Sequence, residues 1–137
     1  METTRLYRPV GLKEMELIAE VNYNAFPPRL DWQPIFYPVT NQEYAEQIAL
    51  EWNTVDEFSG FIGIVTAFEV NTSFLDKYEV QNVGDRNHNE LWIPSEDLAD
   101  FNANIVDGIE IANVHFTDRS FVTENNELRD KLNTFKK

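Results

Sequence analysis

The clearest hydrophobic pattern in the chain lies at residues 60–70, where both alternating sets of positions are apolar. A strand of this kind is typical of the centre of a sheet that is covered on both sides, or of the interior of a sandwich. Two earlier segments have helical periodicity instead. Residues 11–20 carry one apolar face that includes Met15. Residues 40–52 begin with a capping box at Thr40 and repeat a large apolar side chain at every fourth position, namely Tyr44, Ile48 and Trp52.

Shorter elements surround these three. A first strand is expected at residues 6–8 and should end at Pro9, because proline cannot donate a hydrogen bond to a sheet. A helix should begin near residues 94–97 and close at Asp107 and Gly108. The remaining expected elements are a short strand at 35–37, hairpin strands at 77–83 and 90–93, a last strand at 109–116, and a polar terminal segment at 117–137 in which Leu128, Leu132 and Phe135 could line a helix.

Hairpin-like strands mixed with helices predict an α+β fold, formed by a single domain over residues 1–137. We expect a bent, mainly antiparallel sheet with about three helices. Residues 24–39 interrupt the regular pattern, because four prolines and four aromatic residues fall within them and exclude a long regular element. An ordered, aromatic-lined loop is expected there.

The charge of the chain narrows the class of partner. The net charge is −13, and no Lys or Arg occurs between Arg29 and Lys77. A negative field of this size repels phosphate backbones, so binding of nucleic acid by a basic face is not expected. The excess of acidic residues either serves only to keep the protein in solution or indicates a cationic partner.

The composition also bears on the compartment. The chain has no cysteine, which excludes disulfide bonds and thiolate chemistry. The first residues contain no apolar signal segment, and no run approaches the ~20 apolar residues of a membrane span. We therefore expect a soluble, cytoplasmic protein with no membrane partner.

Few residues have the spacing of a known catalytic motif. The histidines, His88 and His115, lie far apart in the sequence and show no metal-ligand spacing, so no metal is expected. The glycine-rich loops of acyl-transfer and nucleotide-triphosphate enzymes are also missing from the sequence. The polar residues that lie beside apolar sequence are Arg8, Arg29, Tyr37 and Glu90, with His88 two residues before Glu90 where a turn enters a strand. Each of these could instead be structural, as an ion pair, a core aromatic or an exposed strand end.

Five segments carry a resemblance to a known family. They are Leu-Tyr-Arg-Pro-Val-Gly-Leu-Lys-Glu at 6–14, Phe-Pro-Pro-Arg-Leu at 26–30, Gln-Pro-Ile-Phe-Tyr-Pro-Val at 33–39, Tyr-Ala-Glu-Gln-Ile-Ala at 44–49 and Glu-Leu-Trp-Ile-Pro-Ser-Glu-Asp-Leu at 90–98. Together they resemble a family of short bacterial proteins that is often labelled "ADP-ribosylation/J-crystallin". The resemblance covers roughly residues 5–116.

A second, weaker resemblance is to the ADP-ribosyltransferase-like fold. Domains of that fold have an Arg or His on the first strand, a Ser, Thr or Tyr near the middle, and a Glu late in the sheet. The resemblance implies that Arg8 binds phosphate, that Tyr37 or Thr40 takes the position of the middle residue, and that Glu90 takes the position of the late carboxylate. The chain departs from that pattern in two places. The Ser-Thr-Ser after the middle strand is missing, and His88 stands where a second Glu or Gln would precede the late Glu.

The first of two hypotheses is an enzyme, or a former enzyme, that handles NAD or ADP-ribose. Arg8 would hold the phosphates, and Glu90 would stabilise the positive charge that develops on the ribose as the nicotinamide glycosidic bond breaks. The ADP-ribosyl group would then pass to an unknown acceptor. The catalytic candidates are Glu90, Arg8, Tyr37 and His88, and the cofactor-binding candidates are Arg8, Phe26, Arg29, Trp32, Tyr37 and Trp92.

The second hypothesis is a non-catalytic acidic module that binds a basic protein, as toxin-neutralising proteins do, by electrostatic steering and a few aromatic anchors. The two hypotheses predict different positions for Arg8 and Glu90. Convergence of Arg8 and Glu90 on one pocket would favour the first. An exposed acidic and aromatic patch, with those two residues far apart, would favour the second.

Overall fold

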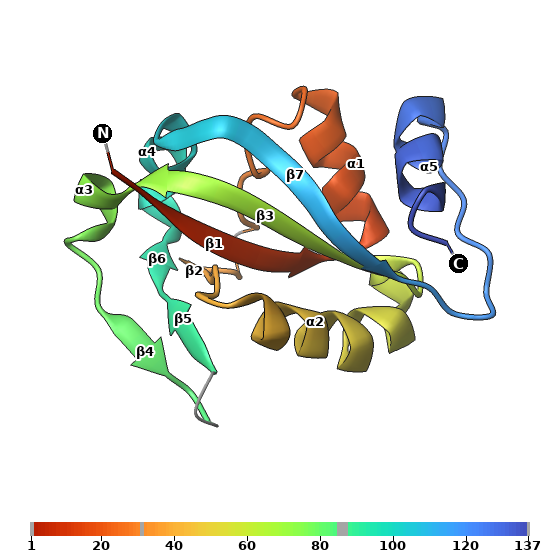
Figure 1. Ribbon diagram of the computed structural model, residues 1–137, viewed down its shortest axis with the longest axis horizontal. Coiled ribbons are helices and arrows are strands. Elements are labelled where there is room, and N and C mark those ends of the chain that lie inside the picture. Colours follow the sequence, from red (N-terminus) through yellow and green to blue (C-terminus); the bar gives the residue numbers. More distant parts are fainter. Residues whose placement is uncertain (1, 31, 85–87, 137) are drawn as a thin grey trace.

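The computed structural model describes residues 2–30, 32–84 and 88–136 of the chain. Its largest sheet is antiparallel and has the order β1–β3–β7, with β3 hydrogen-bonded on both edges (Figure 1). Two smaller antiparallel sheets pair β2 with β6 and β4 with β5. The strands are β1 (Thr3–Val10), β2 (Ile35–Phe36), β3 (Gly63–Asn71), β4 (Val80–Asn82), β5 (Asn89–Leu91), β6 (Ile93–Pro94) and β7 (Ile105–His115).

The described residues also form five α-helices and three short 3-10 turns. The helices are α1 (Leu12–Glu20), α2 (Gln42–Glu51), α3 (Thr72–Leu75), α4 (Leu98–Ala103) and α5 (Asn126–Asn133), and the turns are Asn53–Val55, Glu57–Ser59 and Ser95–Asp97. None of these helices has the length and apolar character needed to cross a lipid bilayer.

The α+β class is confirmed, but two details of the prediction were wrong. The described part of the chain has five α-helices where about three were expected; the helix that no pattern indicated is α3, which has only four residues. Three small sheets replace the single bent sheet. Of the four strands outside the large sheet, β2 and β6 contain only two residues each, too few for hydrophobic alternation to show how they pair.

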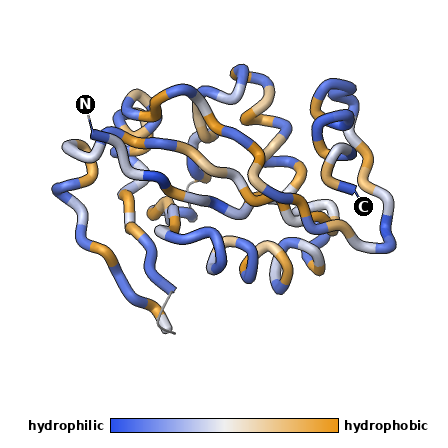
Figure 2. The backbone as a smooth tube through the Cα atoms, viewed as in Figure 1, coloured by the Kyte–Doolittle hydropathy of each residue, from blue (hydrophilic) through white to orange (hydrophobic). Residues whose placement is uncertain are grey.

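β3 is buried on both faces, as its apolar pattern predicts. Ile64 and Phe68 pack against the core that α1, α4 and α5 also line, and this side of the sheet is called the α1 face. Val65 packs against α2, and this side is called the α2 face. Figure 1 shows α1 and α5 on one side of the sheet and α2 on the other, and Figure 2 shows hydrophobic residues along β3. The larger core, on the α1 face, includes Met15, Phe26, Phe36, Phe101 and Leu132.

Pro9 lies inside β1 and does not end the strand. Its partner in the ladder is Val65. Two residues earlier, the N–H of Tyr7 points away from β3 and donates to the carbonyl of Val39 at 2.9 Å. Because backbone groups alternate in direction along a strand, the nitrogen of Pro9 also faces away from β3, where the β1–β3 ladder needs no donor. The prediction that the strand ends at Pro9 was therefore wrong.

α2 differs from the prediction at both ends. Tyr44 is buried and Ile48 is partly buried, as their spacing predicts. Trp52 is 69% exposed, contrary to the prediction, because the helix ends one residue before it and its side chain leaves the apolar stripe. The cap is Asn41 instead of Thr40, since the Asn41 side chain accepts a hydrogen bond from the N–H of Tyr44.

β7 begins earlier than the sequence predicts. Asp107 and Gly108 do not close a helix; they lie within the strand, with φ values of 64° and 81°. The register with β3 shifts at this point. The N–H of Ile109 donates to the carbonyl of Tyr23 at 2.7 Å, and a Cβ at position 108 would lie 3.1 Å from the same oxygen. Glycine thus suits this position by its left-handed backbone and by the close approach of Tyr23.

The hairpin of β4 and β5 joins the large sheet through one residue, Val39. It forms a bridge with Tyr7 of β1 on one side and with Glu90 of β5 on the other. The pairing of β2 with β6 follows the same register, so residues 35–39 run beside residues 90–94 as one ladder. This ladder determines which face of the sheet each candidate residue occupies.

A Gly63→Ala substitution should test how closely α2 packs on β3. A Cβ at position 63 would lie 2.5 Å from the backbone carbonyl oxygen of Ala49, which cannot move without displacing the helix. We expect the free energy of unfolding, measured by urea denaturation, to fall by about 1–3 kcal/mol. An unchanged unfolding midpoint would contradict this packing.

Candidate functional site

The candidate residues fall into two groups on opposite faces of the sheet. Tyr7, Val39 and Glu90 are direct neighbours across three strands, and Tyr7 and Val39 pack on the α2 face. Neighbours in register share a face, so Glu90 also points to the α2 face. Arg8 follows Tyr7 in β1 and points to the α1 face, where it pairs with Glu14. The fold therefore separates Arg8 from Glu90.

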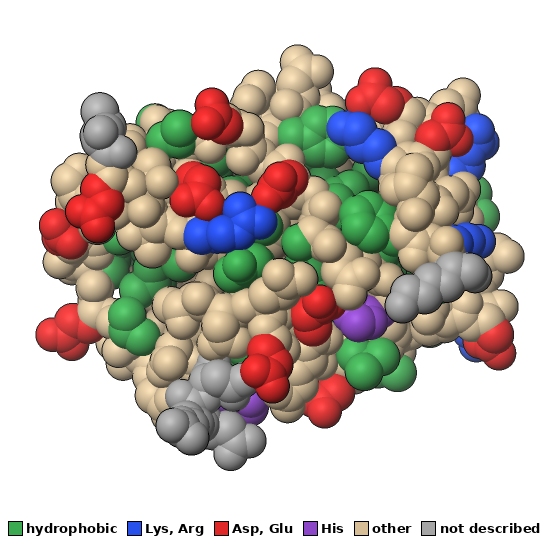
Figure 3. Space-filling model, viewed as in Figure 1, with side chains coloured by type: hydrophobic (Ala, Val, Ile, Leu, Met, Phe, Trp, Pro, Cys, Tyr) green, Lys and Arg blue, Asp and Glu red, His purple; other side chains and the backbone are tan. Residues whose placement is uncertain are grey.

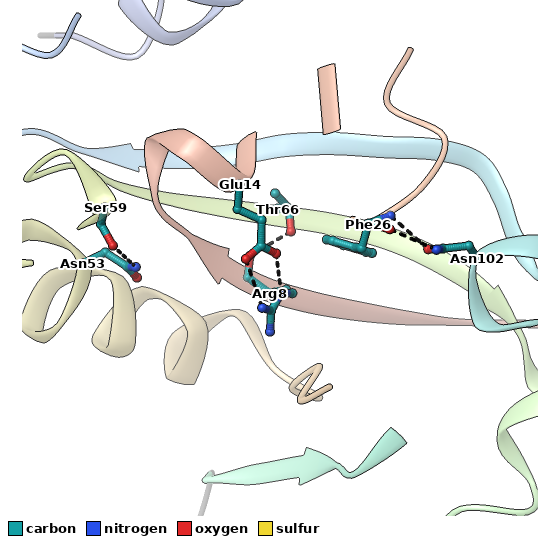
Figure 4. A network of polar contacts seen from close by, with 7 residues as sticks. All are labelled: Arg8, Glu14, Phe26, Asn53, Ser59, Thr66 and Asn102. Carbon is teal, nitrogen blue, oxygen red and sulfur yellow. Dashed lines mark hydrogen bonds and ion pairs between the residues drawn. The ribbon is translucent and has the colours of Figure 1, made fainter. Parts of the chain in front are cut away.

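Arg8 is held in one orientation on the α1 face (Figure 4). Its Nε and Nη2 donate to the two carboxylate oxygens of Glu14 at 2.8 and 3.1 Å. The side chain of Arg8 is only 11% exposed, and its guanidinium carbon lies 4.6 Å from the ring centre of Phe36. Its backbone carbonyl accepts a hydrogen bond from the hydroxyl of Thr66 in β3. A two-point pair of this kind fixes the plane of the guanidinium group.

Arg29 approaches the same ring from the loop before β2. Its guanidinium carbon lies 5.9 Å from the ring centre of Phe36. Among the described residues it has no hydrogen-bond or ion-pair partner, and its Nε is buried. Burial lowers the pKa of Arg29, and the positive charge of Arg8 lowers it further. The lowered pKa reflects a cation whose neighbours do not fully compensate its charge.

These two arginines border a cavity of about 410 Å³, which we call the arginine cleft. Lys13 contributes a third cation to its wall. Asn53 donates from Nδ2 to the hydroxyl of Ser59 at 3.0 Å, but its Oδ1 is buried without a partner. Buried polar atoms without partners are uncommon in folded proteins. Two residues that border the cleft carry such an atom, the donor Nε of Arg29 and the acceptor Oδ1 of Asn53. Its rim includes the apolar side chains of Leu17, Leu30 and Phe58.

The loop that carries Arg29 is fixed by Asn102 of α4. The Oδ1 of Asn102 accepts from the N–H of Phe26 at 2.9 Å, and its Nδ2 donates to the carbonyl of Phe26 at 3.1 Å (Figure 4). The Phe26 ring is buried against Phe36 and Phe68 in the core, so it does not line the arginine cleft. A second cavity of about 320 Å³ adjoins this loop and shares Arg29 with the cleft.

Glu90 is the centre of a second group on the α2 face, which we call the Glu90 cluster: Glu90, Trp92, Tyr37, Tyr44 and His88. The indole N–H of Trp92 donates to one carboxylate oxygen of Glu90 at 2.8 Å, and the hydroxyl of Tyr44 donates to the other at 3.3 Å. Burial raises the pKa of Tyr44, and the charge of Glu90 adds to this effect.

The other members of the Glu90 cluster are held by ring contacts. His88 stacks on Tyr44 with ring centres 4.3 Å apart, and its Nε2 lies 3.0 Å from Oε1 of Gln47. Tyr37 packs edge to face against Trp92 at 6.3 Å. Residues 85–87, in the turn before His88, lie outside the described residues. His88 and Glu90, which are close in the sequence, therefore both contact Tyr44.

The structure therefore unites some of the candidates and divides others. Arg8 and Arg29 share the arginine cleft, whereas Glu90, His88, Tyr37 and Trp92 gather on the opposite face. Tyr37 is the member of this second group that lies near enough to Arg29 to raise its pKa. Trp32 is 76% exposed and lines neither group. Sequence reasoning missed Lys13, Glu14, Asn53 and Asn102. The position of Glu14, in the first turn of a helix that directly follows the strand of Arg8, was a signal for that pair.

A metal site gains no support from the described residues. No three His, Asp or Glu side chains in that part of the chain are grouped so that they could hold a metal ion.

Comparisons of the chain with models of protein families, with curated proteins and with solved structures give no match. The resemblances noted in the sequence remain predictions, and the function must be argued from the geometry of the two groups.

The raised pKa of Tyr44 gives a pH-dependent prediction. An unfolded tyrosine ionises near pH ~10, while folded Tyr44 stays neutral to a higher pH, so its contribution to stability is lost as the pH rises above about 10. We expect the Tyr44→Phe variant to lose one of the phenols that ionise late in an ultraviolet titration. The Glu90→Gln variant should bring that ionisation to lower pH. An unchanged late phase in Tyr44→Phe would contradict the assignment.

Proposed function

We propose that the protein binds a phosphate-bearing small molecule of nucleotide type, such as ADP-ribose or NAD, in the arginine cleft. The observation that carries the proposal is Arg29, whose guanidinium has no ion-pair partner among the described residues and lies over the same ring as that of Arg8. An anion placed between the two would supply the partner that the described residues do not. It would also relieve the repulsion between the two guanidinium groups.

The chemistry of the cleft matches such a ligand in three respects. Arginine is the side chain best suited to two-point contacts with phosphate oxygens. Lys13 adds a further positive charge to the wall of the cleft. The apolar rim can cover a ring, and a volume of about 410 Å³ lies in the range of known small-molecule sites.

The proposal is one of binding, without a transfer step. A ribosyl transfer would need the carboxylate of Glu90 close to the phosphates, and Glu90 lies on the α2 face while the arginines lie on the α1 face. Glu14 is the carboxylate nearest to Arg8, and both its oxygens already accept hydrogen bonds from that residue. The separation of Arg8 and Glu90 therefore favours binding over catalysis, and it is the arrangement that the second hypothesis, a module that binds a basic protein, predicts.

Thermal unfolding should detect the ligand, because a molecule that binds only the folded chain raises the melting temperature. We expect ADP-ribose and NAD to raise it in a concentration-dependent manner, and nicotinamide, which lacks phosphate, to leave it unchanged. Inorganic phosphate should raise it less than ADP-ribose. Absence of any shift at millimolar ADP-ribose and NAD would contradict the proposal.

Three variants locate the site. Arg29→Gln should abolish the shift, while Arg129→Gln, which removes the same charge from α5, should retain it. Glu90→Gln should also retain the shift, because its side chain lies on the opposite face. Equal loss in Arg29→Gln and Glu90→Gln would instead support a site shared by both faces, as the enzyme hypothesis requires.

A further inference from the structure

The ladder that carries Glu90 leaves part of its α2-facing surface uncovered. Tyr37 and Trp92 lie opposite one another in this ladder, and their neighbours Phe36 and Ile93 point into the core on the other side. α2 covers Val39, but Tyr37 remains 41% and Trp92 43% exposed. The carboxylate of Glu90 lies beside them, bound by the indole N–H of Trp92.

From this arrangement we propose that Tyr37, Trp92 and Glu90 form a binding site for a lysine or arginine side chain of a basic protein partner. Two aromatic rings packed at 84° to each other provide a corner with a negative π face, and a carboxylate adjoins it. An aromatic face and an anion together are the usual means of recognising an organic cation. The same half-exposed aromatic residues can serve as anchors of an interface.

The charge around the site favours a cation. No Lys or Arg occurs in the sequence between Arg29 and Lys77, so the segment of Tyr37 and the whole of α2 contribute no positive charge. Two arginines lie near this surface. Arg5 lies on the same face of the sheet, where Glu69 and Glu110 bind its guanidinium at 3.2 and 2.6 Å. Arg29 lies within electrostatic range of Tyr37, but its guanidinium packs over Phe36 on the other side of the ladder. Figure 3 shows that acidic side chains predominate over Lys and Arg on this view of the molecule.

The carboxylate of Glu90 is also kept in place without being neutralised. Its two described donors, Trp92 and Tyr44, are neutral groups, and Tyr44 is buried. Neutral donors orient the oxygens but leave the negative charge for an incoming cation. A net charge of −13 would steer a basic partner towards the protein, and the aromatic corner would select where its side chain binds. The two proposals depend on different charged groups, Glu90 here and Arg29 in the cleft, so either can fail without the other, although Tyr37 lies near enough to Arg29 to raise its pKa.

The indole N–H of Trp92 gives a direct probe of this site, since the chain has three tryptophans and their indole signals can be resolved by NMR. We would titrate the protein with an oligolysine peptide at about 0.15 M salt, where general electrostatic attraction is screened. The Trp92 signal, assigned with Trp92→Phe, should shift more than the other two and should saturate. An oligoglutamate peptide should leave it unchanged.

Charge-matched variants separate a site from a general acidic field. Glu90→Gln should weaken oligolysine binding about tenfold, whereas Glu124→Gln, which removes an exposed carboxylate before α5, should change the affinity less than twofold. Tyr37→Leu keeps the charge and an apolar side chain of moderate size, and should still weaken binding about threefold through the lost ring face. Melting temperatures near that of the wild type establish that the variants are folded.

Two results would overturn the proposal. Equal weakening by Glu90→Gln and Glu124→Gln would mean that the peptide responds only to net charge. A Trp92 signal that stays fixed while oligolysine binds would mean that the peptide binds elsewhere on the surface.

Discussion

β3 is paired on both edges and buried on both faces, and the arrangement of the whole molecule depends on this strand. A sheet of only three long strands cannot cover itself, so helices must pack on each side: α1, α4 and α5 on one, α2 on the other. β1 is bound to β3 over its full length and so inherits the same alternation. Successive residues of β1 therefore belong to different cores, and Tyr7 and Arg8 face opposite sides. The two candidate sites result directly from this alternation.

Much of the fold could be predicted from local pattern. Burial on both faces of residues 63–70, the apolar stripe of the first helix and that of the second helix as far as Ile48 are decided by nearby residues, and they agree with the structure. The errors arose where a distant segment decides the outcome. Pro9 is tolerated because its nitrogen faces away from β3, and Asp107 and Gly108 continue a strand because Tyr23 binds the next N–H. Neither the direction of the Pro9 nitrogen nor the contact with Tyr23 can be inferred from the local sequence.

The candidate sites show the same division between local and distant information. Residue type alone indicated that Arg8 and Arg29 suit an anion, and both border one cleft. The position of Glu90 could not be inferred in that way, because its face depends on the bridge from Tyr7 through Val39, which joins three segments far apart in the sequence. A slip of one residue in that bridge would have turned Glu90 towards Arg8. The chemistry of the candidates was readable from the sequence, but their distribution over two faces was not.

β7 is the outer strand of the large sheet, and its irregular backbone affects how copies of the protein meet. A straight outer strand offers a row of free backbone donors and acceptors to which another chain can add. In β7 this row is interrupted, because Asp107 and Gly108 have left-handed conformations and the carbonyl of Tyr23 already accepts the N–H of Ile109. A second copy could align with only part of the strand, and the charge of −13 on each copy opposes its approach. The irregular backbone at Asp107 and Gly108 thus also disfavours fibrous self-association.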